Sequence, residues 1–132
     1  MRKVVGTVAA AGAALVTLLV APTAAHAATC YGNGCINLDP EATGCAADAT
    51  TPRSVVTSGR TVELRYSRTC RAAWGRVRNA AAGDTVFIHS SAGTEERATV
   101  GPGATSAYTR MLGDAGLTAY ACLYLGGCTG SY

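Results

Sequence analysis

The chain has 132 residues, of which 11 are basic and 8 acidic, and its formal net charge is +3. Its only lysine is Lys3, and its two histidines are His26 and His89. Once the export signal described next is removed, one histidine and no lysine remain. This excludes Schiff-base lysine enzymes, lysine-dependent P-loops, His-Glu-x-x-His metalloproteases and conventional zinc fingers.

Residues 1–27 have the pattern of a secretory signal peptide. Arg2 and Lys3 give a positive start, residues 4–20 form an uncharged apolar run, and Ala-His-Ala at 25–27 fits signal-peptidase cleavage. A retained spanning helix is the competing interpretation, but the Ala and Gly content of the run and the cleavage motif weigh against it. We therefore expect an extracellular, secreted domain of residues 28–132, with a net charge of +1 and no membrane segment after cleavage.

Residues 28–55 are predicted to form an irregular, disulfide-stapled segment, because they show no apolar period of 2 or 3.6. In residues 61–66, apolar and charged side chains alternate as in a half-buried strand. An apolar stripe at helical spacing then predicts a short helix over residues 70–81, ended by Gly83. The stripe consists of Cys70, Ala73, Trp74, Val77 and Ala81.

The rest of the chain is predicted to form strands, at residues 86–89, 94–100, 107–112 and 117–125. The last of these would bury both faces, with Tyr120 turned inward. Residues 60–132 would thus form a strand-helix-strand core. We expect an α+β fold, a small disulfide-stabilised domain of mostly antiparallel β-strands with one helix near residues 70–81.

All six cysteines follow the signal and should pair in an oxidising compartment. Six cysteines allow 15 pairings, and sequence alone leaves the choice open. We favour Cys30–Cys35, Cys45–Cys70 and Cys122–Cys128, because the middle bridge would tie the irregular segment to the start of the predicted helix. A metal or redox role is not expected, since the chain has no Cys-x-x-Cys.

Short motifs spread over residues 29–128 support a family assignment. They are Cys30-Tyr-Gly-Asn-Gly-Cys35, Asp39-Pro40, Gly44-Cys45, Asp48-Ala49, Glu63-Leu-Arg-Tyr-Ser67, Cys70 with Trp74, Tyr108 to Leu112, and Cys122 with Cys128. Together they resemble an uncharacterised actinobacterial family, domain of unknown function 2690. The resemblance implies a small exported protein, but it implies no activity, because the family has none established.

Charge is segregated along the chain. Residues 53–78 contain seven arginines and one acid, Glu63, which gives this stretch a net charge of +6. Guanidinium groups could bind anionic cell-wall polymers or acidic polysaccharides by several contacts, whereas nucleic acid is not the expected partner. A solvated surface is the alternative explanation. The predicted binding residues are Arg65, Arg68, Arg71, Arg76 and Arg78.

An incomplete calcium loop is a further candidate, formed by Asn37, Asp39, Glu41 and Asp48. Ala42 stands where such a loop needs glycine, and Pro40 interrupts it. The alternative is that Asp39 begins a turn and that Asp48 binds backbone amides. We therefore expect no cofactor and no dedicated metal site.

Catalytic residues are not expected. A serine hydrolase would need His89 as its base, and the chain has no Gly-x-Ser-x-Gly motif. Trp74, Tyr66 and Tyr120 are predicted core residues, which leaves the terminal tyrosines as candidate platforms for sugars. The predicted function is a secreted non-enzymatic protein that binds anionic envelope or extracellular polymers. The alternative is an inhibitor of another extracellular protein, with residues 101–106 as the presented loop.

Overall fold

The computed structural model describes residues 11–18 and 27–132, so most of the predicted signal peptide lies outside the described residues. Residues 11–18 contain no helix or strand. No helix within the two described ranges is long and apolar enough to cross a membrane. The folded part of the chain contains two short 3₁₀ helices and eight strands: η1 (Gly32–Cys35), η2 (Cys45–Asp48), β1 (Thr50–Thr57), β2 (Arg60–Ser67), β3 (Ala72–Arg78), β4 (Thr85–Ser90), β5 (Glu95–Thr99), β6 (Ala107–Tyr108), β7 (Leu112–Gly113) and β8 (Ala119–Leu123).

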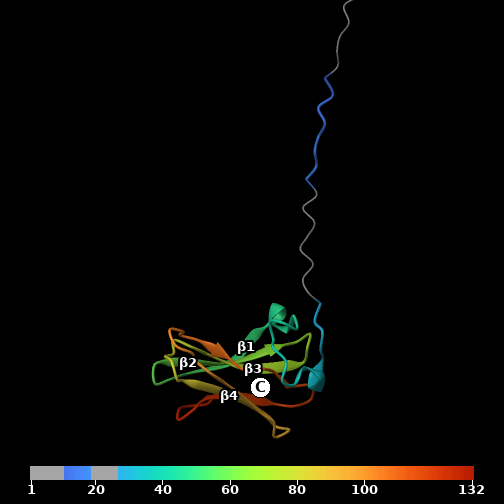
Figure 1. The fold of residues 1–132 in the computed structure, drawn as a ribbon. Coiled ribbons are helices and arrows are strands. Elements are labelled where there is room, and N and C mark those ends of the chain that lie inside the picture. Colours follow the sequence, from blue (N-terminus) through green and yellow to red (C-terminus); the bar gives the residue numbers. More distant parts are fainter. Residues whose placement is uncertain (1–10, 19–26) are drawn as a thin grey trace, which may run out of the picture.

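The strands form two antiparallel sheets that pack face to face (Figure 1). The first sheet has the order β1-β2-β3, and both β6 and β7 pair with the free edge of β3. The second sheet has the order β5-β4-β8. Alternate residues of each strand point between the sheets and form the main hydrophobic core, as expected for a sandwich. Its members include Val62, Leu64, Val77, Ile88 and Ala121.

The main core requires a small residue in the middle of β3. A Cβ atom on Gly75 would lie 3.2 Å from a methyl group of Val86 and 3.5 Å from the Cβ of Ala121, both in the opposite sheet. The first contact is tighter than normal and the second leaves no free space, so a residue larger than alanine would push the sheets apart. Gly75 therefore allows the close approach of the two layers.

The helix predicted over residues 70–81 is wrong, because these residues contain strand β3. Arg71 has a φ of 49° in the turn that joins β2 to β3, and β3 then pairs with β2 through seven residues. The apolar stripe was mistaken for one face of a helix because β3 is covered on both of its faces. Ala73 and Val77 enter the main core, whereas Ala72 and Trp74 point to the opposite side. Among the described residues the helical content is limited to two 3₁₀ turns, so the α+β class is only loosely supported, whereas the predominance of antiparallel strands is confirmed.

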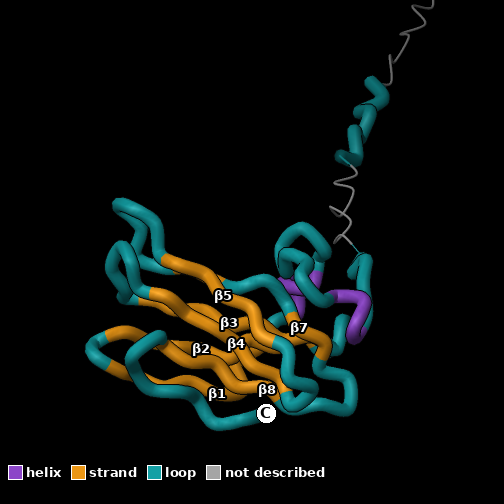
Figure 2. Tube along the Cα trace, turned by 60° about the horizontal axis from the view of Figure 1, so that its bottom comes forward, coloured by secondary structure: helices purple, strands orange, loops and turns teal. Residues whose placement is uncertain are grey.

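A second hydrophobic core covers the outer side of β3. Trp74 is 3% exposed and packs with Ala72, Met111 and the buried cysteines of the N-terminal segment. The segment also pairs with the chain between β6 and β7, because Met111 exchanges backbone hydrogen bonds with Asn37 and Leu38, each 3.0 Å long. Figure 2 shows both 3₁₀ helices at one end of the sandwich, beside β7. The N-terminal segment is thus a cap over one half of this sheet face.

The three favoured disulfides are confirmed: Cys30–Cys35, Cys45–Cys70 and Cys122–Cys128. The first two lie side by side in the second core, with the sulfur atoms of Cys30 and Cys45 3.6 Å apart. The Cys45–Cys70 bridge joins the cap to the turn before β3, as expected. The third bridge closes the turn after β8.

Other boundaries differ from the prediction. β1 begins at Thr50, inside the segment that was predicted to be irregular as far as residue 55. It is an edge strand, its residues are mostly exposed, and it contains a proline. Its sequence therefore lacks the alternation of apolar and polar residues that would predict a strand. The strand predicted at residues 107–112 is split into β6 and β7. Tyr120 is 37% exposed rather than buried, because it lies on the outer face of β8.

Trp74→Ala should destabilise the domain by about 3–5 kcal/mol, because it empties most of the second core. Urea unfolding followed by circular dichroism, with the disulfides intact, would measure this, since the variant lacks the chain's only tryptophan. Tyr124→Ala, at a tyrosine that is 55% exposed, is the matched control and should change the free energy of unfolding by less than about 0.5 kcal/mol. Equal losses in the two variants would show that the second core does not stabilise the fold.

Candidate functional site

The outer face of the first sheet carries a group of partly exposed arginines beyond the edge of the cap. On β3, Ala72 and Trp74 lie under the cap, and the next residues on the same face are Arg76 and Arg78. Arg65 is the partner of Trp74 across the β2–β3 pair. We call Arg65, Arg76 and Arg78 the arginine face.

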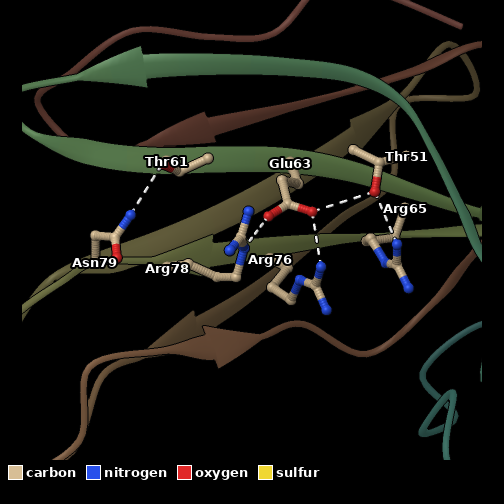
Figure 3. Close-up of polar contacts among 7 residues, drawn as sticks. All are labelled: Thr51, Thr61, Glu63, Arg65, Arg76, Arg78 and Asn79. Atoms are coloured by element: carbon tan, nitrogen blue, oxygen red, sulfur yellow. Dashed lines mark hydrogen bonds and ion pairs between the residues drawn. The ribbon is translucent and has the colours of Figure 1, made fainter.

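Glu63 organises this face, as Figure 3 shows. It is opposite Arg76 in the β2–β3 register, and its side chain is only 4% exposed. Arg76 Nη2 donates to Oε2 over 2.8 Å, and Arg78 Nε donates to Oε1. Thr51 on β1 donates its hydroxyl to Oε2 over 3.2 Å. The carboxylate therefore has partners on both oxygens.

Burial alone would raise the pKa of Glu63, but the hydrogen bonds from Arg78 and Arg76 outweigh it and hold the pKa below its ordinary value. Glu63 is therefore charged at neutral pH, although it is buried. It fixes two guanidinium groups side by side, each with further N–H donors left for a ligand. With one carboxylate for three arginines, the face keeps a net charge of +2.

Arg65 has no carboxylate partner within the described residues. Its Nη1 donates to the Thr51 hydroxyl over 2.7 Å, and its Nε is buried without a partner. Burial lowers the pKa of its guanidinium, and the nearby charge of Arg76 lowers it further. Thr51 thus connects Arg65 to Glu63 and holds it beside the other two arginines.

The five predicted binding residues do not form one surface. Arg68 and Arg71 lie in the turn between β2 and β3, at the end of the sandwich, and not on the arginine face. Of the other arginines in this stretch, Arg60 forms an ion pair with Asp84 at 2.8 Å. The charge cluster of the sequence is therefore divided into a face and a turn.

Arg68 and Arg71 line a cavity of about 530 Å³, which we call the turn cavity. Its lining comes from β1 and β2, from the turn that joins β2 to β3, from the segment between β7 and β8, and from the end of the chain. The lining residues are Thr50, Tyr66, Arg68, Arg71, Asp114, Leu117 and Tyr132. The sequence offered Asp114 only as a carboxylate that could orient His89 in a serine hydrolase. Its place beside Arg68 and Arg71 was missed, because only the fold brings it to arginines 43 and 46 positions earlier.

Asp114 is an unusual member of the turn cavity. It is 5% exposed, and its Oδ1 is buried without a hydrogen-bond partner in the described part of the chain. Burial raises its pKa to about 6, and the charge of Arg71 opposes this only in part. Its backbone N–H donates to the Arg71 carbonyl over 2.9 Å, which holds the two residues together.

The calcium candidates have separate structural roles. Asp39 Oδ1 accepts from the backbone N–H groups of residues 41 and 42, at 2.8 and 3.0 Å. Asp48 accepts from the Ser67 hydroxyl at 2.6 Å and from Thr69 N–H and hydroxyl at 2.9 Å. These contacts are the alternative roles that the sequence suggested. Their carboxylates do not converge with that of Glu41, and the backbone oxygen of Asn37 accepts from Arg110.

Within residues 11–18 and 27–132, one group of potential metal ligands lies close together: Cys30, Cys35, Cys45 and Cys70. Their Sγ atoms lie within 4.8 Å of one another, but all four are joined in disulfides and offer no thiolate.

His89 lies on the outer face of the second sheet. Its Nε2 is 2.8 Å from Glu95, and its ring stacks on Tyr120 with a centroid distance of 5.3 Å. The Phe87 ring meets the His89 ring edge to face, with a centroid distance of 5.1 Å. These contacts describe a sheet surface stabilised by cross-strand pairs.

Fold and site define a small disulfide-bonded β-sandwich with an arginine face and a separate polar cavity. Residues 29–122 match the family described as "Protein of unknown function (DUF2690)", and the chain belongs to this family. The resemblance found in the motifs is thereby confirmed. No curated protein and no solved structure matches the chain. The matched residues include the whole arginine face, both turn arginines and Asp114.

Glu63→Gln should destabilise the protein by about 2 kcal/mol at pH 7, because two arginines lose a buried anionic partner but remain partly solvated. Since the pKa of Glu63 is lowered on folding, its contribution is present above its ordinary pKa and disappears as the pH falls through its folded value. Urea unfolding at neutral and acidic pH should thus show a difference that vanishes in acid. Glu96→Gln, without an ion pair in the described residues, is the control; an equal loss there would contradict the role of Glu63.

Asp114→Asn should change the pH dependence of stability. Because the pKa of Asp114 is about 6 in the folded state, against about 3.9 unfolded, wild-type stability should fall as the pH rises from 4 to 7. The variant lacks this term, so relative to wild type it should gain about 2–3 kcal/mol over that range. Urea unfolding at each pH unit measures the trend. Asp84→Asn is the control: a hydrogen bond from Arg60 lowers the pKa of Asp84, so its contribution changes only in stronger acid and its difference from wild type should stay nearly constant from pH 5 to 7. A flat difference for Asp114→Asn as well would contradict the burial argument.

Proposed function

We propose that this domain is exported and binds anionic extracellular polymers through the arginine face. The observation that carries the proposal is the arrangement around Glu63, in which one buried carboxylate holds two guanidinium groups in place beside a third. Export is supported by the signal pattern of residues 1–27 and by three disulfides in a small domain.

The face suits a repeating polyanion for two physical reasons. Its guanidinium groups are held by Glu63 and Thr51 before a ligand arrives, so binding costs less side-chain entropy than it would for free arginines. Arginine also offers paired N–H donors that match carboxylate, phosphate and sulfate oxygens. A polymer with an anionic group on each unit can then contact several arginines in succession, and its affinity should fall as salt increases.

Inhibition of another protein is less well supported. Residues 102–106 of the predicted loop are exposed, but none of the three disulfides has a cysteine in it. The rigid presentation that an inhibitory loop needs therefore has no covalent support here. We retain polymer binding as the function.

The test compares two double variants that lose the same charge. Arg65→Gln/Arg78→Gln weakens the arginine face but leaves Arg76 as a partner for Glu63, whereas Arg97→Gln/Arg110→Gln removes two exposed arginines elsewhere. Binding of the disulfide-bonded protein to heparin and to purified cell walls would be measured at 50 and 150 mM salt. We expect the first variant to bind about tenfold more weakly at 150 mM salt and the control to stay close to wild type.

Arg65→Gln/Arg78→Gln should melt somewhat below the wild type, because Glu63 loses one of its two arginine partners. Melting curves that show both variants fully folded at the temperature of the binding assay separate lost binding from lost folding. Equal losses in the two variants would mean that net charge alone attracts the polymer, and the arginine face would have no specific role. No binding of the wild type to either probe would overturn the proposal.

A further inference from the structure

The turn cavity is separate from the arginine face. It lies at the end of the sandwich, because its residues come from the start of β1, the end of β2, the β2–β3 turn and the segments that enter and follow β8. On β2, Tyr66 points to the opposite side of the sheet from Glu63 and Arg65 and packs against the main core. A ligand in this cavity would therefore meet other side chains than a polymer on the arginine face.

The charged side chains of the turn cavity form no ion pairs with one another, and some of their buried atoms have no hydrogen-bond partner in the part of the chain that the structure describes. Neither Arg68 nor Arg71 forms an ion pair within the described residues, and Arg71 Nε and Asp114 Oδ1 are both buried without a hydrogen-bond partner. The other two such atoms in the described residues, Nε of Arg65 and of Arg76, lie on the arginine face. In the turn cavity a donor and an acceptor on neighbouring residues both lack a partner, which calls for an explanation. Two guanidinium groups and a carboxyl beside one cavity provide both anion binding and hydroxyl binding.

The apolar part of the cavity is aromatic. The rings of Tyr66 and Tyr132 meet edge to face, with centroids 5.4 Å apart and an interplanar angle of 67°. The guanidinium of Arg53 lies 5.8 Å from the Tyr132 centroid, which helps to fix that ring. Leu117 adds a further apolar wall. Tyrosine rings offer an apolar surface with a polar tip, which suits a ligand that has C–H groups and hydroxyls on the same ring.

We propose that the turn cavity binds one acidic monosaccharide, a sugar ring that carries a carboxylate or phosphate group. Arg68 and Arg71 would bind the anionic group, Asp114 would bind ring hydroxyls, and Tyr66 and Tyr132 would contact the C–H face of the sugar. A volume of about 530 Å³ lies within the range of small-molecule sites. This site is independent of the proposed polymer binding, because it uses none of the three residues of the arginine face.

The experiment titrates the disulfide-bonded protein with glucuronate, glucose 6-phosphate, glucose and inorganic phosphate, by calorimetry and by ¹⁵N–¹H NMR. We expect glucuronate, glucose 6-phosphate or both to bind at least about tenfold more tightly than glucose or inorganic phosphate, because only they engage charged and aromatic groups together. The two acidic sugars separate a carboxylate site from a phosphate site. The largest NMR shifts should fall on residues 66–71 and 114–117 and on Tyr132.

Three variants test the assignment of groups. Arg71→Gln should weaken acidic-sugar binding about tenfold, because it removes a charged partner of the ligand. Asp114→Asn and Tyr132→Ala should also weaken it, whereas Arg97→Gln, on β5, should bind like wild type. Melting curves and the NMR spectra without ligand would show that each variant is folded.

Two results would overturn the inference. Binding of inorganic phosphate as tight as that of glucose 6-phosphate, together with no glucuronate binding, would reduce the cavity to a simple anion site. No binding of either acidic sugar would exclude the proposed ligand class. Neither result affects polymer binding, which is measured with the Arg65→Gln/Arg78→Gln variant and would fail separately.

Discussion

The double coverage of β3 is the constraint on which the rest of this structure depends. A strand with one face in the main core and the other under the disulfide-bonded cap must carry apolar or small residues at consecutive positions, and Ala72, Ala73, Trp74 and Gly75 are all buried. The cap ends after Trp74, so the next outward residue is free to be charged. The position of the arginine face therefore follows from the length of the cap, which Cys45–Cys70 and the contacts around Met111 fix.

The same constraint explains which features could be predicted from the sequence. The alternation in residues 61–66 identified β2, since one of its faces is apolar and the other charged. The positions of the cysteines after an export signal led to the prediction of the three disulfides, and the short motifs led to the family assignment. These signals are local. The prediction failed for β3 because a strand that is buried on both faces has no alternation of apolar and polar residues, and because its apolar residues also fit a helical spacing.

For the candidate binding site, the sequence could predict which residue type it contains but not which residues lie together. The sequence showed that arginines dominate residues 53–78, but strand periodicity and the turn decide which of them meet. Arg76 and Arg78 share a face with Arg65, whereas Arg71 turns away in the left-handed region before β3 begins. Glu63 appeared in the sequence as one acid among seven bases. Its role as the anchor depends on the pairing of β2 with β3, which no local pattern contains.

The two buried carboxylates illustrate how structure distinguishes an acid that supports the fold from one that remains open to a ligand. Glu63 and Asp114 are similarly buried, and burial raises the pKa of each. For Glu63, hydrogen bonds from Arg78 and Arg76 and the charges of these arginines reverse this effect. With the Thr51 hydroxyl as a further donor, both carboxylate oxygens have partners. For Asp114, the guanidinium of Arg71 lowers the pKa by its charge, but Oδ1 accepts no hydrogen bond from any described residue, and burial prevails. A raised pKa in a cavity with unpartnered donors is the pattern expected where the missing partner comes from outside the protein. Glu63 thus belongs to the scaffold of the arginine face, and Asp114 belongs to the turn cavity as a group that a ligand can complete.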